Sequence, residues 1–158
     1  MIVICDSSPL IALSLLDKLN LLDRLFNDVL IPLSVFNEVT MDNKSEAARI
    51  AKWARNKVVV ATNIRLVESF SLLLDKGEAE ALSLYIEKEA DFLLIDEKKG
   101  RKVACYNKIN IVGTLGIILM SKKRGLISEV KPLLESLQQS YIRISDELYR
   151  KTLELAQE

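Results

Sequence analysis

Short, wholly apolar runs that alternate with helix-like segments are the feature that most restricts the fold of this chain. Ile2–Cys5 and Phe92–Ile95 contain no charged or hydroxyl side chain, which is typical of strands covered on both faces. Val29–Ile31, Val58–Ala61 and Ile109–Val112 are three further short strand candidates. Because continuous apolar strands separated by helices form parallel sheets, the pattern predicts an α/β fold: a three-layer sandwich with a central parallel sheet of four to five strands between helices.

The segments between these strands carry apolar residues at helical spacing. Ser8 and Pro9 are an expected N-cap and first helical residue, and Thr114 is the expected cap of a later helix. Tyr141–Ile144 is a candidate extended segment. The expected helices cover residues 10–26 with a break near Asn20, 33–40, 47–55, 66–74, 78–89, 98–108, 115–123, 128–138 and 146–157.

The chain reads as one domain. Its 158 residues match an ordinary single core, and no Ser/Gly/Pro-rich linker or repeat interrupts Met1 to Glu158. We expect the helical tail, from about residue 126 to 158, to pack on the sheet or to form a dimer interface.

The composition excludes several kinds of catalytic site, but it does not identify a binding partner. The 22 basic and 22 acidic residues balance, so any nucleic-acid site must be local, and the absence of His excludes His-based nucleophilic and zinc sites. Carboxylates must therefore carry most of any chemistry. Cys5 and Cys105 lie in apolar runs, there is no signal-like start and no long apolar span, and we expect a cytoplasmic protein without membrane contact.

Two aspartates directly follow apolar strands. Asp6 comes after the first strand and Asp96 after the fourth. The carboxyl ends of parallel strands meet at one edge of a sheet, where ligands bind, so both side chains are expected at that edge. The alternative interpretation is that each aspartate only caps the helix that follows it.

Two glutamates add to these aspartates. Glu78 shares the packed helix face of Ala81 and Leu82, so its carboxylate needs a partner such as a metal ion, although the positive end of its own helix is the alternative. Glu80 points to the other face and is expected to face solvent. Glu38 lies at the border of an apolar stripe, where it either reaches a cleft or is a solvated helix acid.

A cluster of cations follows Asp96. Lys98, Lys99 and Arg101 form either a solvated helix face or a phosphate-binding group. The short block Gly113–Gly116 has neither the Walker nor the dinucleotide glycine spacing and is interpreted as a turn with a cap.

The order of these motifs resembles a known family. Ile2–Ile11, Ile31 and Pro32 followed by Glu38, Gly77–Ala81, Leu93–Asp96 and Gly113–Gly116 together resemble a PIN domain, in the small branch that carries Gly-Glu-Ala-Glu-Ala and Gly-Thr-Leu-Gly blocks. The resemblance runs from Met1 to about Arg124, and the tail is also similar to that branch.

The resemblance implies a metal-dependent ribonuclease of the kind found in toxin–antitoxin pairs and RNA processing. It makes Asp6, Glu38, Glu78 and Asp96 the acids that hold Mg²⁺ or Mn²⁺ and hydrolyse RNA phosphodiester bonds, with Lys98, Lys99 and Arg101 as substrate-binding candidates. It also implies a homodimer and, for a toxin, a cognate antitoxin.

Two other functions compete with hydrolysis. Ile95 stands where many family members have Thr or Ser, which favours a weakly active or inactive PIN-like module that binds a protein partner or RNA. A phospho-acceptor receiver domain also has clustered acids on a parallel sheet, but it normally has paired acids after its first strand, whereas Asp6 is followed by two serines.

Overall fold

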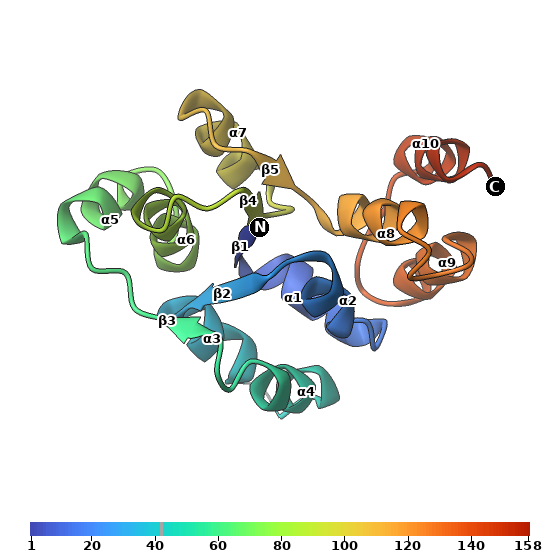
Figure 1. Cartoon of the computed structure of the whole chain (residues 1–158), viewed down its shortest axis with the longest axis horizontal. Helices are drawn as coiled ribbons and strands as arrows, with labels where there is room; N and C mark the ends of the chain where they lie inside the picture. Colours follow the sequence, from blue (N-terminus) through green and yellow to red (C-terminus); the bar gives the residue numbers. More distant parts are fainter. Residues whose placement is uncertain (42) are drawn as a thin grey trace.

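A computed structural model describes residues 1–41 and 43–158 of the chain. Within these residues five short strands form one sheet in the order β3-β2-β1-β4-β5, and every neighbouring pair is parallel. The order places β1 at the centre of the sheet (Figure 1). The strands are β1 (Ile2–Cys5), β2 (Asp28–Pro32), β3 (Val58–Val59), β4 (Phe92–Leu94) and β5 (Ile111–Val112).

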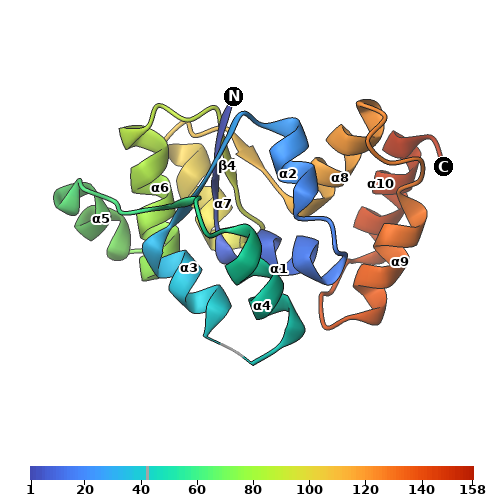
Figure 2. The ribbon, with the colours of Figure 1, turned by 60° about the horizontal axis from the view of Figure 1, so that its bottom comes forward.

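Helices cover both faces of this sheet, which confirms the expected three-layer α/β fold (Figures 1 and 2). The helices are α1 (Ser7–Leu15), α2 (Asn20–Leu25), α3 (Leu33–Thr40), α4 (Ser45–Trp53), α5 (Ile64–Ser71), α6 (Lys76–Glu87), α7 (Lys98–Tyr106), α8 (Thr114–Lys123), α9 (Lys131–Gln139) and α10 (Asp146–Ala156).

The alternating residues of the strands divide between two apolar cores. Val3 and Cys5 of β1 pack with α1, α2, α3 and α4, whereas Ile4 packs with α5, α6 and α7. All three side chains are fully buried. This two-sided burial explains why β1 is apolar at every position.

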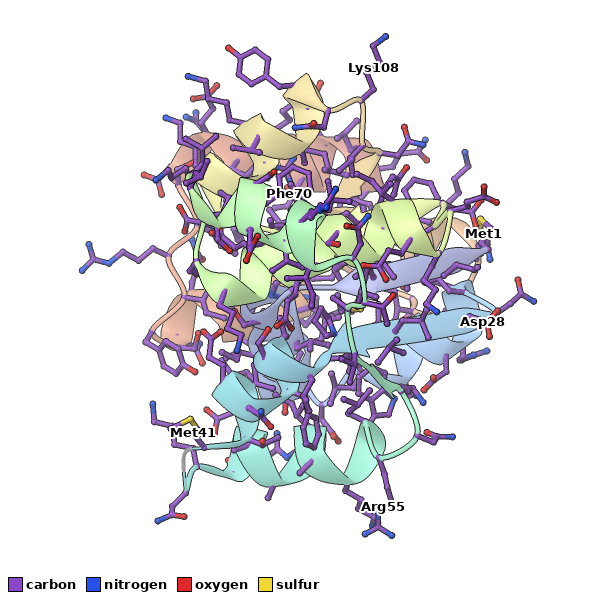
Figure 3. The ribbon with its side chains drawn as sticks, turned by 90° about the vertical axis from the view of Figure 1, so that its left-hand side faces the viewer. Met1, Asp28, Met41, Arg55, Phe70 and Lys108 are labelled. Carbon is purple, nitrogen blue, oxygen red and sulfur yellow. The ribbon has the colours of Figure 1, made fainter. Side chains whose placement is uncertain are left out.

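The carboxyl ends of the strands lie together at one edge of the sheet. Met1 and Asp28, at the amino ends of β1 and β2, lie on one side of the molecule, and Met41, after α3, lies on the opposite side (Figure 3). The segments that follow β1, β2 and β4 therefore start on the side away from the N-terminus, where the candidate acids are found.

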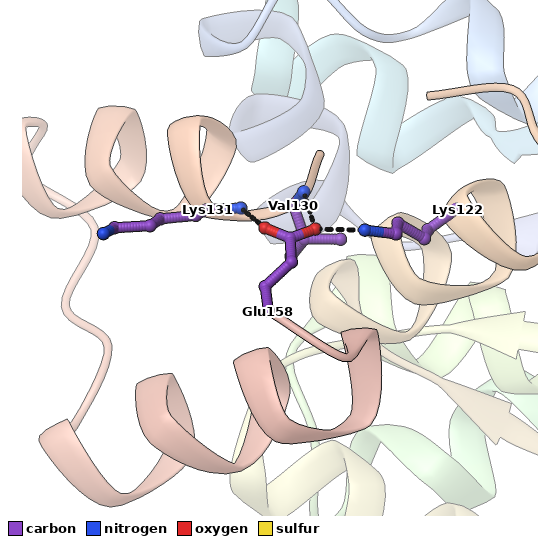
Figure 4. Close-up of polar contacts among 4 residues, drawn as sticks. All are labelled: Lys122, Val130, Lys131 and Glu158. Carbon is purple, nitrogen blue, oxygen red and sulfur yellow. Dashed lines mark hydrogen bonds and ion pairs between the residues drawn. The ribbon is translucent and has the colours of Figure 1, made fainter. Parts of the chain in front are cut away.

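The C-terminal helices α9 and α10 lie together beside α8 (Figure 2). α9 and α10 pack through Leu134, Leu137 and Ala156 on Ile118 of α8 and on the outer side of α1. Glu158, after the end of α10, connects these helices. Its carboxylate accepts hydrogen bonds from the Lys122 side chain of α8 and from the backbone N–H groups of Val130 and Lys131 at the start of α9 (Figure 4).

Some expected elements differ in the structure. The strands after β1 are mostly shorter than expected at one end, and residues 141–144 form an irregular connection instead of a strand. Cys5 is buried as expected, but Cys105 is exposed on α7. No helix in the described part of the chain is long and apolar enough to span a bilayer.

Candidate functional site

Asp6 lies at the centre of the carboxyl edge. It follows β1 directly, its backbone N–H donates to the carbonyl of Leu94 at 2.9 Å, and it occupies the N-cap position of α1. Its side chain makes no capping hydrogen bond to that helix, although its residue is only 2% exposed. Capping of α1 therefore does not account for this buried carboxyl group.

The surroundings of Asp6 disfavour its ionised form. Burial is the largest cause that raises its pKa to about 7, and a hydrogen bond from the Ser7 backbone partly opposes this effect. Negative charge on Glu78, Asp75 and Glu38 raises the pKa further. These charge effects indicate that Asp6, Glu38 and Glu78 lie near one another at this edge of the sheet.

Glu78 is held at the start of α6 by a reciprocal capping box. Its backbone N–H donates to Asp75 Oδ1 at 2.9 Å, and its Oε2 accepts from the Asp75 backbone N–H at 3.2 Å. The other oxygen, Oε1, is buried and has no hydrogen-bond partner among the residues that the structure describes. Burial also raises the pKa of Glu78. The helix end thus satisfies only half of this carboxylate.

Glu38 approaches the same group of acids from α3. Burial is the main cause that raises its pKa, followed by the charge of Asp75, while a hydrogen bond with the Ser7 side chain lowers it. Gly77 lies between the two acids: a Cβ atom there would be 3.4 Å from Glu38 Oε2 and 3.5 Å from Asp75 Oδ1. Gly77 therefore lies next to both carboxylates, and a Cβ atom there would be in van der Waals contact with each of them.

Asp75 is the acid that the sequence interpretation missed. It interacts electrostatically with Asp6, Glu38 and Glu78, and it lines a hollow of about 450 Å³ with Glu38 and Gly77. The signal was present, because Asp75 and Glu78 have the spacing of a capping box before an apolar helix.

Asp96 is placed differently from the other acids. It is exposed, and its two oxygens accept hydrogen bonds from the backbone N–H and the hydroxyl of Thr114. Thr114 was expected to cap its own helix, but Gly113 occupies the N-cap position of α8. Asp96 therefore binds the start of α8 instead of capping α7, whose N-cap residue is Glu97.

Two other sequence expectations can be compared with the structure. Lys98 and Lys99 are exposed, whereas Arg101 is half-buried and its guanidinium donates to the Ile95 carbonyl at 3.0 Å. Lys99 lies close enough to lower the pKa of Glu78. Glu80 was expected to face solvent, but it is half-buried and accepts from the backbone N–H of Ser34 at 3.2 Å, which joins α6 to α3.

The donor set partly fits a divalent cation. A buried Asp6, a buried Glu78 oxygen without a partner and a neighbouring Glu38 provide hard oxygen atoms whose mutual repulsion a cation would relieve. In the described residues, however, no three His, Cys, Asp or Glu side chains are already arranged to hold one.

Comparison with known proteins agrees with this architecture. A family model, DUF3368, described as a PIN domain, matches residues 2–158. No curated protein and no solved structure gives a match. PIN domains are generally nucleases. Because the match covers nearly the whole chain, and the five described strands form the parallel α/β sheet expected for this fold, the chain belongs to the PIN domain family.

Proposed function

We propose that this protein is a metal-dependent endoribonuclease that hydrolyses RNA phosphodiester bonds at the carboxyl edge of its sheet. The observation that carries the proposal is the buried Glu78 Oε1. In the described part of the chain this oxygen has no hydrogen-bond partner, and it lies in the same acid cluster as the buried Asp6. Burying a carboxylate without a partner lowers the stability of the fold, and residues that lower stability in this way are typical of functional sites.

Four acids are assigned to the site. Asp6, Glu38, Glu78 and Asp96 would hold Mg²⁺ or Mn²⁺, and a bound ion of this kind supplies activation of water and neutralisation of phosphate charge. Asp6 and Glu78 provide the buried oxygens, and the Ser7 side chain orients Glu38. The Thr114 hydroxyl and backbone fix the orientation of Asp96.

Cations beside the acids suit an anionic substrate. Lys98 and Lys99 at the start of α7 are exposed, and Arg101 lies one turn further along the helix. We assign these three side chains to the RNA backbone, because an acidic centre alone repels phosphate. Lys99, which already influences Glu78, is the cation that the electrostatics link most directly to the acids.

Cleavage of a structured RNA in Mg²⁺ or Mn²⁺ tests this proposal. We expect the parent protein to cut the RNA, and the Asp6→Asn and Asp96→Asn variants to lose at least about a hundredfold in rate, in line with the loss of a group that positions a catalytic ion. Glu135→Gln, which removes an exposed acid from α9, is the matched control and should cut like the parent. Equal rates for all four proteins would refute the mechanism.

A non-catalytic module that binds a protein partner or RNA is the second candidate. It is favoured because Thr114 already occupies both Asp96 oxygens and because the described acids are not arranged around a single ion position. The response of stability to divalent ions separates the two functions, since only the nuclease requires an ion among its acids.

The family resemblance extends the proposal to cellular role. We propose a cytoplasmic protein that acts as a homodimer and, if it is a toxin, is inhibited by a cognate antitoxin, which could place a basic side chain among the acids. Co-purification with the product of a neighbouring gene, together with suppression of RNA cleavage by that product, is the expected result. Cleavage that persists in the complex would contradict the antitoxin assignment.

A further inference from the structure

The connection between α9 and α10 places a basic side chain, Arg143, in a hollow that Asp96 also lines, and an exposed aromatic side chain, Tyr141, two residues earlier. Tyr141 is 61% exposed and Arg143 is exposed. Ile142 and Ile144, which alternate with them, pack into the apolar cluster formed by α1, α8, α9 and α10. We call residues 140–145 the connector. Because these residues alternate, Ile142 and Ile144 pack against the helices on one side of the connector, and Tyr141 and Arg143 lie on its exposed side.

Two hollows meet at the connector. One has a volume of about 430 Å³ and is lined by Ser8, Asp96, Thr114, Ile142, Arg143 and Leu148, among others. The second, of about 800 Å³, is lined by connector residues that include Tyr141 and Arg143. Arg143 therefore borders both hollows, and Asp96 joins the first of them to the proposed catalytic edge.

The size and chemistry of these hollows suit a nucleotide better than a folded partner. The smaller hollow is within the range of small-ligand sites, and its lining combines apolar side chains with the polar or charged residues Ser8, Asp96, Glu97, Thr114 and Arg143. Unpaired RNA bases stack on aromatic rings and on guanidinium planes, and the backbone phosphates pair with Arg and Lys. Lys44 Nζ lies over one face of the Tyr141 ring, 5.3 Å from its centre, and adds positive charge next to this ring.

We propose that the connector is a single-stranded RNA subsite next to the acid edge. Tyr141 stacks on an unpaired base, Arg143 binds a backbone phosphate, and the hollow beside Asp96 receives the neighbouring base. This inference rests on the proposed ribonuclease function and deepens it, because it assigns residues of the connector, outside the acid cluster, to binding of the RNA strand.

Binding of a labelled single-stranded oligoribonucleotide, measured by fluorescence anisotropy, tests the subsite. The measurements use full-length protein carrying Asp6→Asn, so that cleavage does not interfere. We expect Tyr141→Ala and Arg143→Ala each to weaken binding about tenfold. Arg143→Ala should also reduce the salt dependence by about one phosphate contact, and Tyr141→Ala should leave it unchanged.

Matched controls come from residues of the same type elsewhere. Tyr106 is 78% exposed at the end of α7, which returns to the amino edge of the sheet, and Arg150 is exposed on α10. Tyr106→Ala and Arg150→Ala should bind like the Asp6→Asn parent. All four substituted side chains are exposed, and an unchanged melting temperature checks that each variant is folded.

The outcomes separate this inference from the proposed function. Connector variants that bind within twofold of the Asp6→Asn parent, or a duplex that binds as tightly as the single strand, would overturn the subsite. If the connector binds a protein partner instead of RNA, the connector variants should bind RNA within twofold of the Asp6→Asn parent. Failure of the unsubstituted protein to cleave RNA, combined with connector-dependent binding, would instead refute hydrolysis and leave the subsite supported.

Discussion

At the scale of single residues, Gly100 shows how tightly α7 approaches the acid cluster. A Cβ atom at this position would lie 2.8 Å from Glu78 Oε1 and would also overlap the Ile95 side chain. Ala is normally about 1 kcal/mol better than Gly inside a helix. Here the overlap reverses that preference, because inserting a methyl group into a packed site costs about 1–3 kcal/mol.

We therefore expect Gly100→Ala to lower the free energy of unfolding and to displace Glu78. Urea unfolding measures the first effect. Lys102→Ala, at an exposed position of the same helix, is the control and should change stability by less than about 0.5 kcal/mol. A Gly100→Ala protein that is as stable as the parent would show that Glu78 and Ile95 are free to move away.

Asp6 makes stability depend on pH. Its folded-state pKa is about 7, above the ordinary value of 3.8, so the unfolded chain releases this proton at lower pH than the folded chain does. Stability must then fall as pH rises from about 4 to 7, by an amount on the order of 4 kcal/mol when all of the shift is expressed. Asp6→Asn removes the ionisation while keeping the size of the side chain.

In a buffer without divalent ions, Asp6→Asn should be more stable than the parent above pH 7 and close to it near pH 4. Urea unfolding at both pH values measures the difference. Glu135→Gln should follow the parent throughout, since Glu135 is exposed on α9. A parent that becomes more stable between pH 4 and 7, relative to Asp6→Asn, would contradict the raised pKa.

The sequence predicted some of the acids and not their partners. Asp6 could be placed because an all-apolar strand ends directly before it, and Glu78 because helical geometry puts it on a packed face. The bond between Asp96 and Thr114 joins residues 18 positions apart through the neighbouring strands β4 and β5. Such a contact depends on strand order, which local patterns do not encode.

At the scale of elements, the start of α6 combines a structural and an electrostatic role. Asp75 caps the helix and is also a charge that raises the pKa values of Asp6, Glu38 and Glu78. Asn and Asp are similar as N-caps, whereas Ala loses the cap. Substitution of Asp75 can therefore separate the two roles.

We expect Asp75→Ala to be about 1 kcal/mol less stable than Asp75→Asn at pH 7.5 without divalent ions, because only Asn accepts the Glu78 backbone N–H. Asp75→Asn should be at least as stable as the parent, since it removes a charge from the acid cluster. Urea unfolding of the three proteins measures both differences. Equal destabilisation by Asn and Ala would mean that the charge of Asp75, and not its cap, stabilises the helix start.

The positions of helices and strands were predictable where a strand is buried on both faces or a helix has apolar residues at regular spacing. The bounds expected for β1 and α3 are those of the structure, because an apolar strand and an amphipathic stripe end sharply at Asp6 and Thr40. The connector was harder to predict: Ile142 and Ile144 alternate like strand residues, but they pack on helices and have no neighbouring strand. Alternation alone does not distinguish these two environments.

At the scale of the whole molecule, the C-terminal tail lies next to Asp96 at the carboxyl edge of the sheet. Leu148 of α10 and Arg143 of the connector share a hollow with Asp96. The Glu158 carboxylate holds α10 against α8 and α9, and its hydrogen bonds with Lys122, Val130 and Lys131 lower its pKa to about 2. Glu158 therefore stays ionised at any physiological pH, and its hydrogen bonds to α8 and to the start of α9 do not depend on pH in that range.

Binding of a divalent ion among the acids should stabilise the folded protein, because the ion offsets the repulsion between their charges. A ligand that binds only the folded state adds about 2.7 kcal/mol at a concentration one hundred times its Kd, or several degrees of melting temperature for a protein of this size. We expect millimolar Mn²⁺ or Mg²⁺ to raise the melting temperature of the parent at pH 8, and EDTA to reverse the change.

The same ions should have little effect on Asp6→Asn, and the stabilisation of the parent should fade toward pH 5, where protons compete with the ion for Asp6 and Glu78. Differential scanning fluorimetry measures both trends, with Glu135→Gln as the variant that should keep the full response. An equal shift in the parent and in Asp6→Asn would place the ion elsewhere on the surface. A parent that shows no shift at all would favour the binding module over the nuclease.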